Sequence, residues 1–209
     1  MQHYVSYYTG GMTETTAKPD RRAERSRQAI LDATRELLAE GTVGALTVEA
    51  VAARSGVAKT TIYRRWRDKW ELALDAVMID VVQRFDELAD VGDTRKELLA
   101  YADWVVTMLA ATPMGPAMQG LVSQIATDPG LARVYREQVV QPRLAQLAPV
   151  IARGIARGDL RPGTEVRLVH ELLAGPIFYR LLLSGAPLEH TLGARLVDAV
   201  LAGFTPRAS

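Results

Sequence analysis

The sequence predicts an all-α protein of about nine helices, with a three-helix head that carries a helix-turn-helix and a larger helical domain after it. Apolar residues recur at helical spacing almost throughout, and no stretch alternates like a half-buried strand. Basic charge gathers near the N-terminus. Residues 18–69 hold twelve Lys and Arg against seven Asp and Glu, a net of +5, and the rest of the chain, at −4, brings the total to +1. This asymmetry favours a polyanion-binding module joined to a body with another task.

The composition excludes several functional classes. The chain of 209 residues has no cysteine, which rules out disulfides, zinc–thiolate sites and cysteine nucleophiles. It has three histidines but no HExxH, no GxSxG and no glycine-rich phosphate loop, so we expect neither an enzyme nor a bound metal or cofactor. No run of about 18 apolar residues predicts a membrane span, and the N-terminus has no apolar leader. We expect a cytoplasmic protein without a membrane partner.

The chain divides into four parts. We expect a polar tail over residues 1–19, the helix-turn-helix head over 20–67, a connecting helix over 68–91 and the larger domain over 92–209. Breaks rich in Gly, Pro and capping residues separate the helices of that domain. These helices are predicted at about 94–111, 115–127, 130–157, 164–184 and 188–204.

Within the head, the first helix is expected over about 20–40. Thr47 can N-cap the second helix, Gly56 supplies the tight turn after it, and the third helix begins near Ala58. A short helix, a glycine turn and a second short helix form the geometry that delivers a recognition helix to the DNA major groove. The basic run RRAERSR in the first helix fits either phosphate contacts or a solvated first turn.

The stretch KTTIYRRWRDK, from Lys59 to Lys69, is strongly basic. On a helical wheel Ala58, Ile62 and Trp66 share one arc, which would anchor the helix to its neighbours. The opposite arc is formed by hydroxyl, phenol and guanidinium groups, from Thr60, Thr61, Tyr63 and Arg64. Such groups contact phosphates and base edges. A solvated basic face is the alternative, and the turn before the helix favours DNA binding over it.

The run AILDATRELLAEGTVGALTVEAVAARSGVAKTTIYRRWRDKWELALDAV resembles the N-terminal DNA-binding domain of tetracycline-repressor-type (TetR) regulators, over about residues 25–77. The resemblance implies that the residues that contact DNA are Thr47, Lys59, Thr60, Thr61, Tyr63, Arg64, Arg65 and Lys69. Tyr63 and Lys69 would hold phosphates. The sequence departs from the family pattern at Arg65 and Trp66, where His and Phe are common. Whether Arg64 and Arg65 read guanine or hold phosphate stays open.

The last two helices are apolar on more than one face, so one face must be buried against something. A partner subunit is one solution, and packing within the domain is the other. TetR-type regulators dimerise through their last two helices, and the resemblance therefore implies a homodimer on a palindromic operator. The predicted interface residues are Leu172, Ile177, Leu181, Leu192, Leu196, Val200 and Phe204.

The middle helices are rich in Met and aromatic residues, which suit an adaptable apolar pocket as well as an ordinary core. The resemblance favours the pocket, because this domain binds a small inducer in the family. The predicted lining is Trp104, Met108, Met114, Met118, Tyr135, His170, Phe178 and Tyr179. We therefore expect a homodimeric repressor that is released from DNA by a small, largely apolar ligand. The alternative is a helical ligand-binding or scaffold protein without DNA function.

Overall fold

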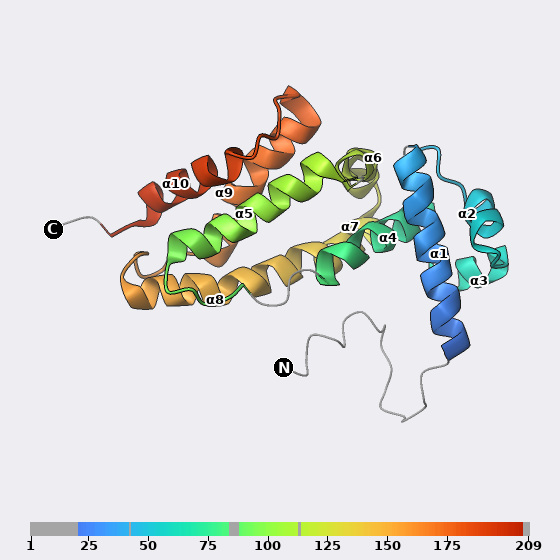
Figure 1. The fold of residues 1–209 in the computed structure, drawn as a ribbon, viewed down its shortest axis with the longest axis horizontal. Helices are drawn as coiled ribbons and strands as arrows, with labels where there is room; N and C mark the ends of the chain where they lie inside the picture. The colour runs from blue at the N-terminus through green and yellow to red at the C-terminus, as the bar shows by residue number, and fades with distance from the viewer. Residues whose placement is uncertain (1–20, 42, 84–87, 113, 207–209) are drawn as a thin grey trace.

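The computed structural model describes residues 21–41, 43–83, 88–112 and 114–206, and for 79–83 only the backbone. These residues form helices and no strand, so the predicted all-α fold is confirmed (Figure 1). In order, the helices are α1 Arg21–Glu40, α2 Val48–Ser55, α3 Lys59–Arg65, α4 Lys69–Gln83, α5 Thr94–Ala111, α6 Met114–Thr127, α7 Pro129–Tyr135, α8 Gln141–Arg157, α9 Val166–Tyr179 and α10 Leu192–Phe204.

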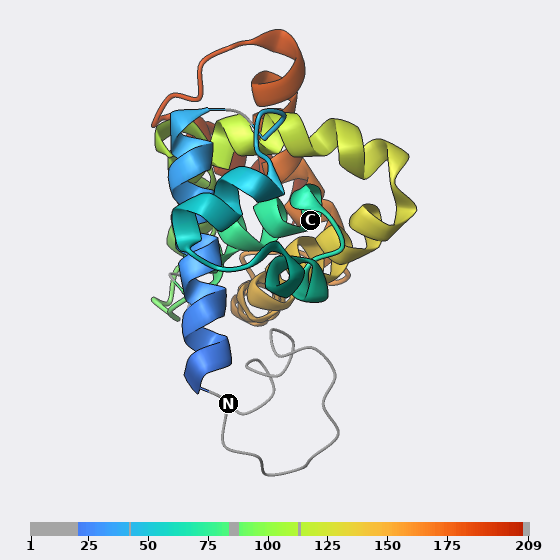
Figure 2. The same cartoon turned by 90° about the vertical axis from the view of Figure 1, so that its right-hand side faces the viewer.

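The head is built from α1, α2 and α3 around a small apolar core, whose buried members include Ile30, Leu31, Val51 and Ile62. Thr47 caps α2 as predicted, since its Oγ1 accepts a hydrogen bond of 3.1 Å from the backbone N–H of Ala50. Gly56 adopts a left-handed conformation with φ of 68° between α2 and α3. A side chain at this position would strain the turn. Figure 2 looks onto the head, with α1 along one edge and α2 and α3 in front of the body.

Helix α4 joins the head to the body. The carboxylate of Asp75 on α4 accepts hydrogen bonds from the indole N–H of Trp66 at 3.0 Å and from the guanidinium of Arg27 at 3.2 Å. Charge-assisted hydrogen bonds of this kind fix orientation as well as adding stability. One carboxylate on α4 therefore holds both the residue that ends α3 and a side chain of α1.

In the body, α5 runs between α8 and α10 (Figure 1). Its inner side is buried through Leu98, Tyr101, Val105 and Leu109. Helix α10 packs along α5 and also contacts α9, while α6 and α7 lie between the body and the head. The head is thus at one end of the molecule, and α4, α6 and α7 connect it to the rest.

Several helix bounds differ from the sequence prediction. The predicted helix over 68–91 is observed as α4 from Lys69 to Gln83; residues 84–87 lie outside the described chain. The predicted helix over 130–157 is helical throughout but contains a π-helical segment, Arg136–Val140, between α7 and α8. Pro142 explains this interruption, because it has no N–H and its ring clashes with the carbonyl four residues earlier.

The C-terminal helices show two further differences. The predicted helix over 164–184 is α9 followed by a second π-helical segment, Arg180–Ser184. The predicted helix over 188–204 begins only at Leu192, after an extended loop.

No single helix in the described part of the chain is long and apolar enough to cross a bilayer; α5 and α6, bent by 90° at their junction, meet the length and composition only as a pair. The described residues contain no group of three or more His, Cys, Asp or Glu side chains that could hold a metal ion.

Gly193→Ala is expected to destabilise the body. A Cβ at Gly193 would collide with Oδ1 of Asp103 and lie 3.1 Å from the backbone nitrogen of the same residue on α5. Overpacking of this kind costs about 1–3 kcal/mol. Gly203→Ala, also on α10, is the matched control, because a Cβ there meets nothing within 4 Å. Chemical denaturation measures both free energies of unfolding, and equal stability of the two variants would contradict the close approach of α10 to α5.

Candidate DNA-binding surface and ligand cavity

Helix α3 has the predicted amphipathic division in part: Ile62 and Trp66 are buried as expected, but Ala58, predicted on the anchoring side, is exposed because it is the extended N-cap residue before the helix. Ile62 and Trp66 are buried against the head, and the Trp66 indole is held by Asp75. The outward side carries Thr60, Tyr63 and Arg64, all exposed, and the Tyr63 side chain is 54% exposed. An exposed large aromatic residue beside an exposed arginine and a threonine forms a surface that can bind phosphates and base edges.

Both lysines predicted to contact DNA, Lys59 and Lys69, have partners inside the head. The ammonium of Lys59 lies 3.0 Å from Oε1 of Glu49 on α2, and the hydrogen bond from this ammonium lowers the pKa of the Glu49 carboxyl below its ordinary value. The ammonium of Lys69 donates to the carbonyl of Gly44 at 2.7 Å. Both contacts are exposed, so they orient the lysines without burying them. Thr47 is exposed at the N-terminus of α2.

The two adjacent arginines of α3 differ in orientation. Arg65 donates from Nη2 to the backbone carbonyl of Ala23 on α1 at 3.2 Å, so its side chain runs along the first turns of α1. Arg64 is exposed on the side of Thr60, while Thr61 is half-buried. The geometry therefore favours Arg64 over Arg65 as the residue that can enter a groove.

The arginines of the basic run in α1 also differ in orientation: some are exposed, and one is held inside the head. Arg21, Arg22 and Arg25 are exposed, and Arg27 is held by the carboxylate of Asp75. Arg27 is thus part of the contact between α1 and α4, whereas the first turn of α1 lies beside Arg65 and extends the basic surface of α3.

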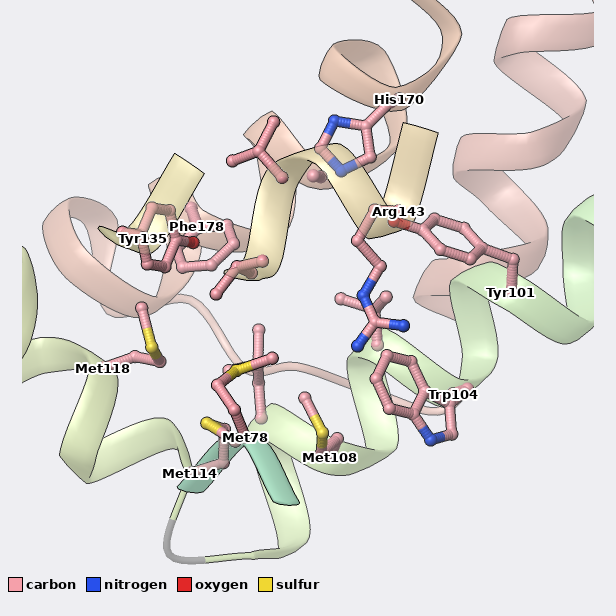
Figure 3. A pocket seen from close by; sticks show the side chains of 15 residues that line it. Met78, Tyr101, Trp104, Met108, Met114, Met118, Tyr135, Arg143, His170 and Phe178 are labelled. Carbon is pink, nitrogen blue, oxygen red and sulfur yellow. The ribbon is translucent and has the colours of Figure 1, made fainter. Parts of the chain in front are cut away.

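A cavity lies in the body between α4, α5, α6, α9 and the helical stretch that contains α7 and α8, with an empty volume of about 530 Å³ that includes space open to solvent. Seven predicted residues line it, namely Trp104, Met108, Met114, Met118, Tyr135, His170 and Phe178 (Figure 3). The eighth, Tyr179, does not, because it lies on the outer side of α9 with 59% of its surface exposed.

Sequence reasoning missed other lining residues, among them Met78, Tyr101 and Arg143. Tyr101 could have been found, because it lies one turn before Trp104 on the same face of α5. Arg143 also carried a signal, since it is a charged residue on the apolar side of a helix that includes Val139 and Leu147. Whether Met78 lines the cavity depends on where the end of α4 meets the body, and local sequence does not encode this.

The ionisable groups of the cavity wall are shifted by burial. Burial raises the pKa of Tyr135 to about 12 and also raises the pKa of Tyr101. Burial, followed by the charge of Arg143, lowers the pKa of His170. Near neutral pH both phenols and the imidazole are therefore uncharged, and the guanidinium of Arg143 is charged.

The structure corrects the predicted dimer face. Ile177, Leu192, Val200 and Phe204 are buried inside the same chain, so they do not offer a surface to a partner. The apolar stripe of α10 is explained mainly by its packing along α5. Leu181 and Leu196 are half-buried, and Leu172 is exposed. The exposed large apolar side chains in this region are Leu168, Leu172 and Tyr179 on the outer side of α9 and Leu183 in the π-helical segment that follows it.

Helix α6 provides a second connection between cavity and head. Met114 and Met118 on α6 line the cavity. At the far end of the helix, Asp128 caps α7 and lies 2.6 Å from the guanidinium of Arg67, which belongs to the turn between α3 and α4. The hydrogen bonds from the backbone of Leu131 and Gly130, together with Arg67, lower the pKa of Asp128 and keep it ionised.

A basic helix-turn-helix head at one end of an all-α body defines a helix-turn-helix DNA-binding regulator. The comparisons with known proteins agree with this class. Residues 30–76 match the protein family described as "Bacterial regulatory proteins, tetR family", and residues 88–200 match the family described as "Tetracyclin repressor-like, C-terminal domain". The chain belongs to the TetR family of transcriptional regulators, whose members are regulators and not enzymes.

Relatives and solved structures extend the match over most of the chain. The uncharacterized HTH-type transcriptional regulator YdeS of Bacillus subtilis is 32% identical, over 78% of this chain and 82% of its own. The DNA-binding transcriptional repressor TetR of Mycobacteroides abscessus is 29% identical, over 86% and 94%. The crystal structure of the TetR family transcription regulator SCO0332 is 33% identical, with a TM-score of 0.74 over 87% of this chain and 100% of its own.

Arg64→Ala is expected to relax sequence preference at one position of the DNA site, at a cost of about 1–3 kcal/mol in specific binding, because we expect this exposed arginine to contact a base edge. Arg65→Ala is the matched control. Its guanidinium lies along α1, so we expect it to weaken binding to all sequences by a similar factor. Selection from random duplex DNA, followed by anisotropy titrations, measures both effects. A uniform loss for Arg64→Ala would identify Arg64 as a phosphate contact.

Proposed function

We propose that this protein is a homodimeric repressor that binds a palindromic operator and leaves it when a small, largely apolar ligand fills the cavity of the body. The observation that carries the proposal is the position of α4. Its Asp75 holds the recognition helix through Trp66, and Met78, one turn further along the same helix, lines the cavity. One rigid element is thus in contact with both sites.

The ligand would act by favouring one arrangement of the heads over another. A ligand that presses on Met78 shifts α4, and one that presses on Met114 or Met118 shifts α6. Both helices are linked to the head, α4 through Asp75 in its middle and α6 through Asp128, which follows its last residue and pairs with Arg67. A differential affinity of about 1–3 kcal/mol is typical for coupling of this kind.

The outer side of α9 supports the homodimer. Leu168, Leu172 and Tyr179 fall within one narrow arc of the helix, and Gly175 in the same arc has open space where a Cβ would lie. A contiguous exposed apolar stripe marks an interaction surface, and a two-fold partner would cover it with its own copy. Two heads related in this way would meet half-sites roughly 34–36 Å apart.

Ligand release is tested by DNA binding of the purified protein. We expect steeply salt-dependent binding to a duplex selected from random sequence, because several phosphate contacts are made. Compounds that raise the melting temperature of the protein should weaken operator binding by about 5–150-fold. Ala174→Phe tests the same cavity, since Ala174 lines it and a larger side chain would fill it. This variant should no longer respond to the compounds and, like a bound ligand, should itself weaken operator binding. Stabilising compounds that leave operator affinity unchanged would contradict the proposal.

Leu172→Asp is expected to give monomers that keep their fold, because this side chain is 42% exposed in the single chain. A charge there would be buried without a partner in the dimer, and operator affinity should fall with dimerisation. Val91→Asp is the matched control, since Val91 is 56% exposed but lies in the loop before α5. Sedimentation gives the mass of each variant. An unchanged dimer mass for Leu172→Asp would remove α9 as the interface.

A further inference from the structure

Glu49 places a carboxylate on the part of the head that we expect to contact DNA. It lies in the first turn of α2, and its side chain is 64% exposed. Its Oε1 lies 3.0 Å from the ammonium of Lys59, the first residue of α3. Figure 2 shows α2 and α3 together in front of the body. A negative charge here repels the phosphates of DNA, so it weakens binding unless it also acts on the basic groups around it.

The contact between Glu49 and Lys59 goes beyond the two ordinary roles of an exposed glutamate in a first turn. Such a carboxylate interacts favourably with the helix dipole, but Thr47 already caps α2, and the dipole is served without any contact to α3. An exposed ion pair adds little to stability, a factor of about five or less in the folding equilibrium. What the contact does is join two helices across ten positions of the sequence and direct the Lys59 ammonium.

A directed lysine differs from a free one in the phosphates that it can reach. Lysine has a flexible four-carbon stem, so without a partner its ammonium follows phosphates in many registers of the protein on DNA. Binding to the wrong sequence consists almost entirely of such phosphate contacts. In the correct register, Tyr63 and Arg64 fix the head on the DNA, and the ammonium of Lys59 has three N–H donors. One donor stays with Glu49 while another contacts DNA.

We propose that Glu49 is a specificity-determining residue, which restrains Lys59 so that this lysine contacts DNA in the correct register and reaches fewer phosphates in others. The proposal rests on the DNA-binding part of the proposed function and does not depend on ligand release. Glu49 is a positioning residue in this account, because it acts through Lys59. Its effect is to lower the affinity for unrelated DNA more than the affinity for the operator.

Glu49→Gln tests this role on the full-length protein, because it removes the charge and keeps the shape of the side chain. Anisotropy titrations at several salt concentrations compare a duplex selected from random sequence with a scrambled duplex of the same composition. We expect the scrambled duplex to bind about 2–5-fold more tightly per head, as for the loss of an exposed ion pair. The slope of log affinity against log salt should steepen by about 0.9 per head, since a freed Lys59 neutralises one more phosphate. Affinity for the selected duplex should change by less.

Glu36→Gln is the matched control for the change in net charge. Glu36 lies on α1, is 59% exposed and pairs with Arg54 at 3.2 Å, so the variant loses a similar ion pair away from α3. It should leave both affinities within about twofold of the unchanged protein. In a Lys59→Gln background, Glu49→Gln should have no further effect, because the side chain that it releases is gone. Circular dichroism and the melting temperature establish that each variant is folded.

Three results would overturn the role of Glu49. Equal gains on both duplexes would mean that its carboxylate only repels phosphates. The same gain in the Lys59→Gln background would mean that it does not act through Lys59. A changed base preference at one position, found by repeating the selection with Glu49→Gln, would make it a base-reading residue.

Failure of the proposed function is distinguishable from these results. If the unchanged protein binds neither duplex, DNA binding is contradicted and the role of Glu49 with it. If the effects of Glu49→Gln appear as expected while stabilising compounds leave operator affinity unchanged, the role of Glu49 stands and ligand release alone is contradicted.

Discussion

The carboxylate of Asp75 fixes the position of the DNA-binding head relative to the body. It accepts hydrogen bonds from Trp66 at the end of α3 and from Arg27 on α1, and it belongs to α4. Losing one partner of such a part-buried charged contact costs several kcal/mol, since the remaining charge is left unpaired. The recognition helix therefore follows α4 as one rigid unit. Because Met78 on the same helix lines the cavity, α4 is in contact with both the cavity and the end of α3.

A second contact, between Arg67 and Asp128, also limits how the head can move relative to the body. Arg67 in the turn after α3 pairs with Asp128, and Asp128 also caps α7 through the N–H groups of Gly130 and Leu131. The first contact is made by α4 and the second by Asp128 at the junction of α6 and α7, and both α4 and α6 reach the cavity. A head held at two points has a defined orientation, and a molecule placed between the two helices acts on both points. This arrangement gives a physical basis for coupling between ligand and DNA without a flexible linker.

Local patterns were enough to predict most helices, the cap at Thr47, the turn at Gly56 and the buried side of α3 at Ile62 and Trp66, because each depends on residues close in the sequence. They could not predict the partners of the outward side chains. Arg65 reaches Ala23 on α1, a contact 42 positions away. Periodicity also identified the apolar stripe that holds Val200 and Phe204, but assigned it to a dimer interface, whereas both residues are buried within the chain, where α10 packs along α5. Which surface covers an apolar stripe depends on tertiary packing, which local sequence does not encode. For the same reason, the sequence predicted both Phe178 and Tyr179 in the cavity wall, although only Phe178 lines it and Tyr179 is exposed.

Helix α9 connects the cavity with the proposed dimer surface. His170, Ala174 and Phe178 follow at intervals of four residues and line the cavity. Leu168, Leu172 and Tyr179 lie on the opposite, exposed side of the same helix. A ligand that moves the inner side by a fraction of an ångström must move the outer side equally, because a helix is stiff and the body is close-packed. In the proposed homodimer, ligand binding would therefore change both the angle of each head, through α4 and α6, and the angle between the two subunits. Both changes would alter the separation of the recognition helices, so we expect a modest shift in the cavity to misalign them with consecutive major grooves.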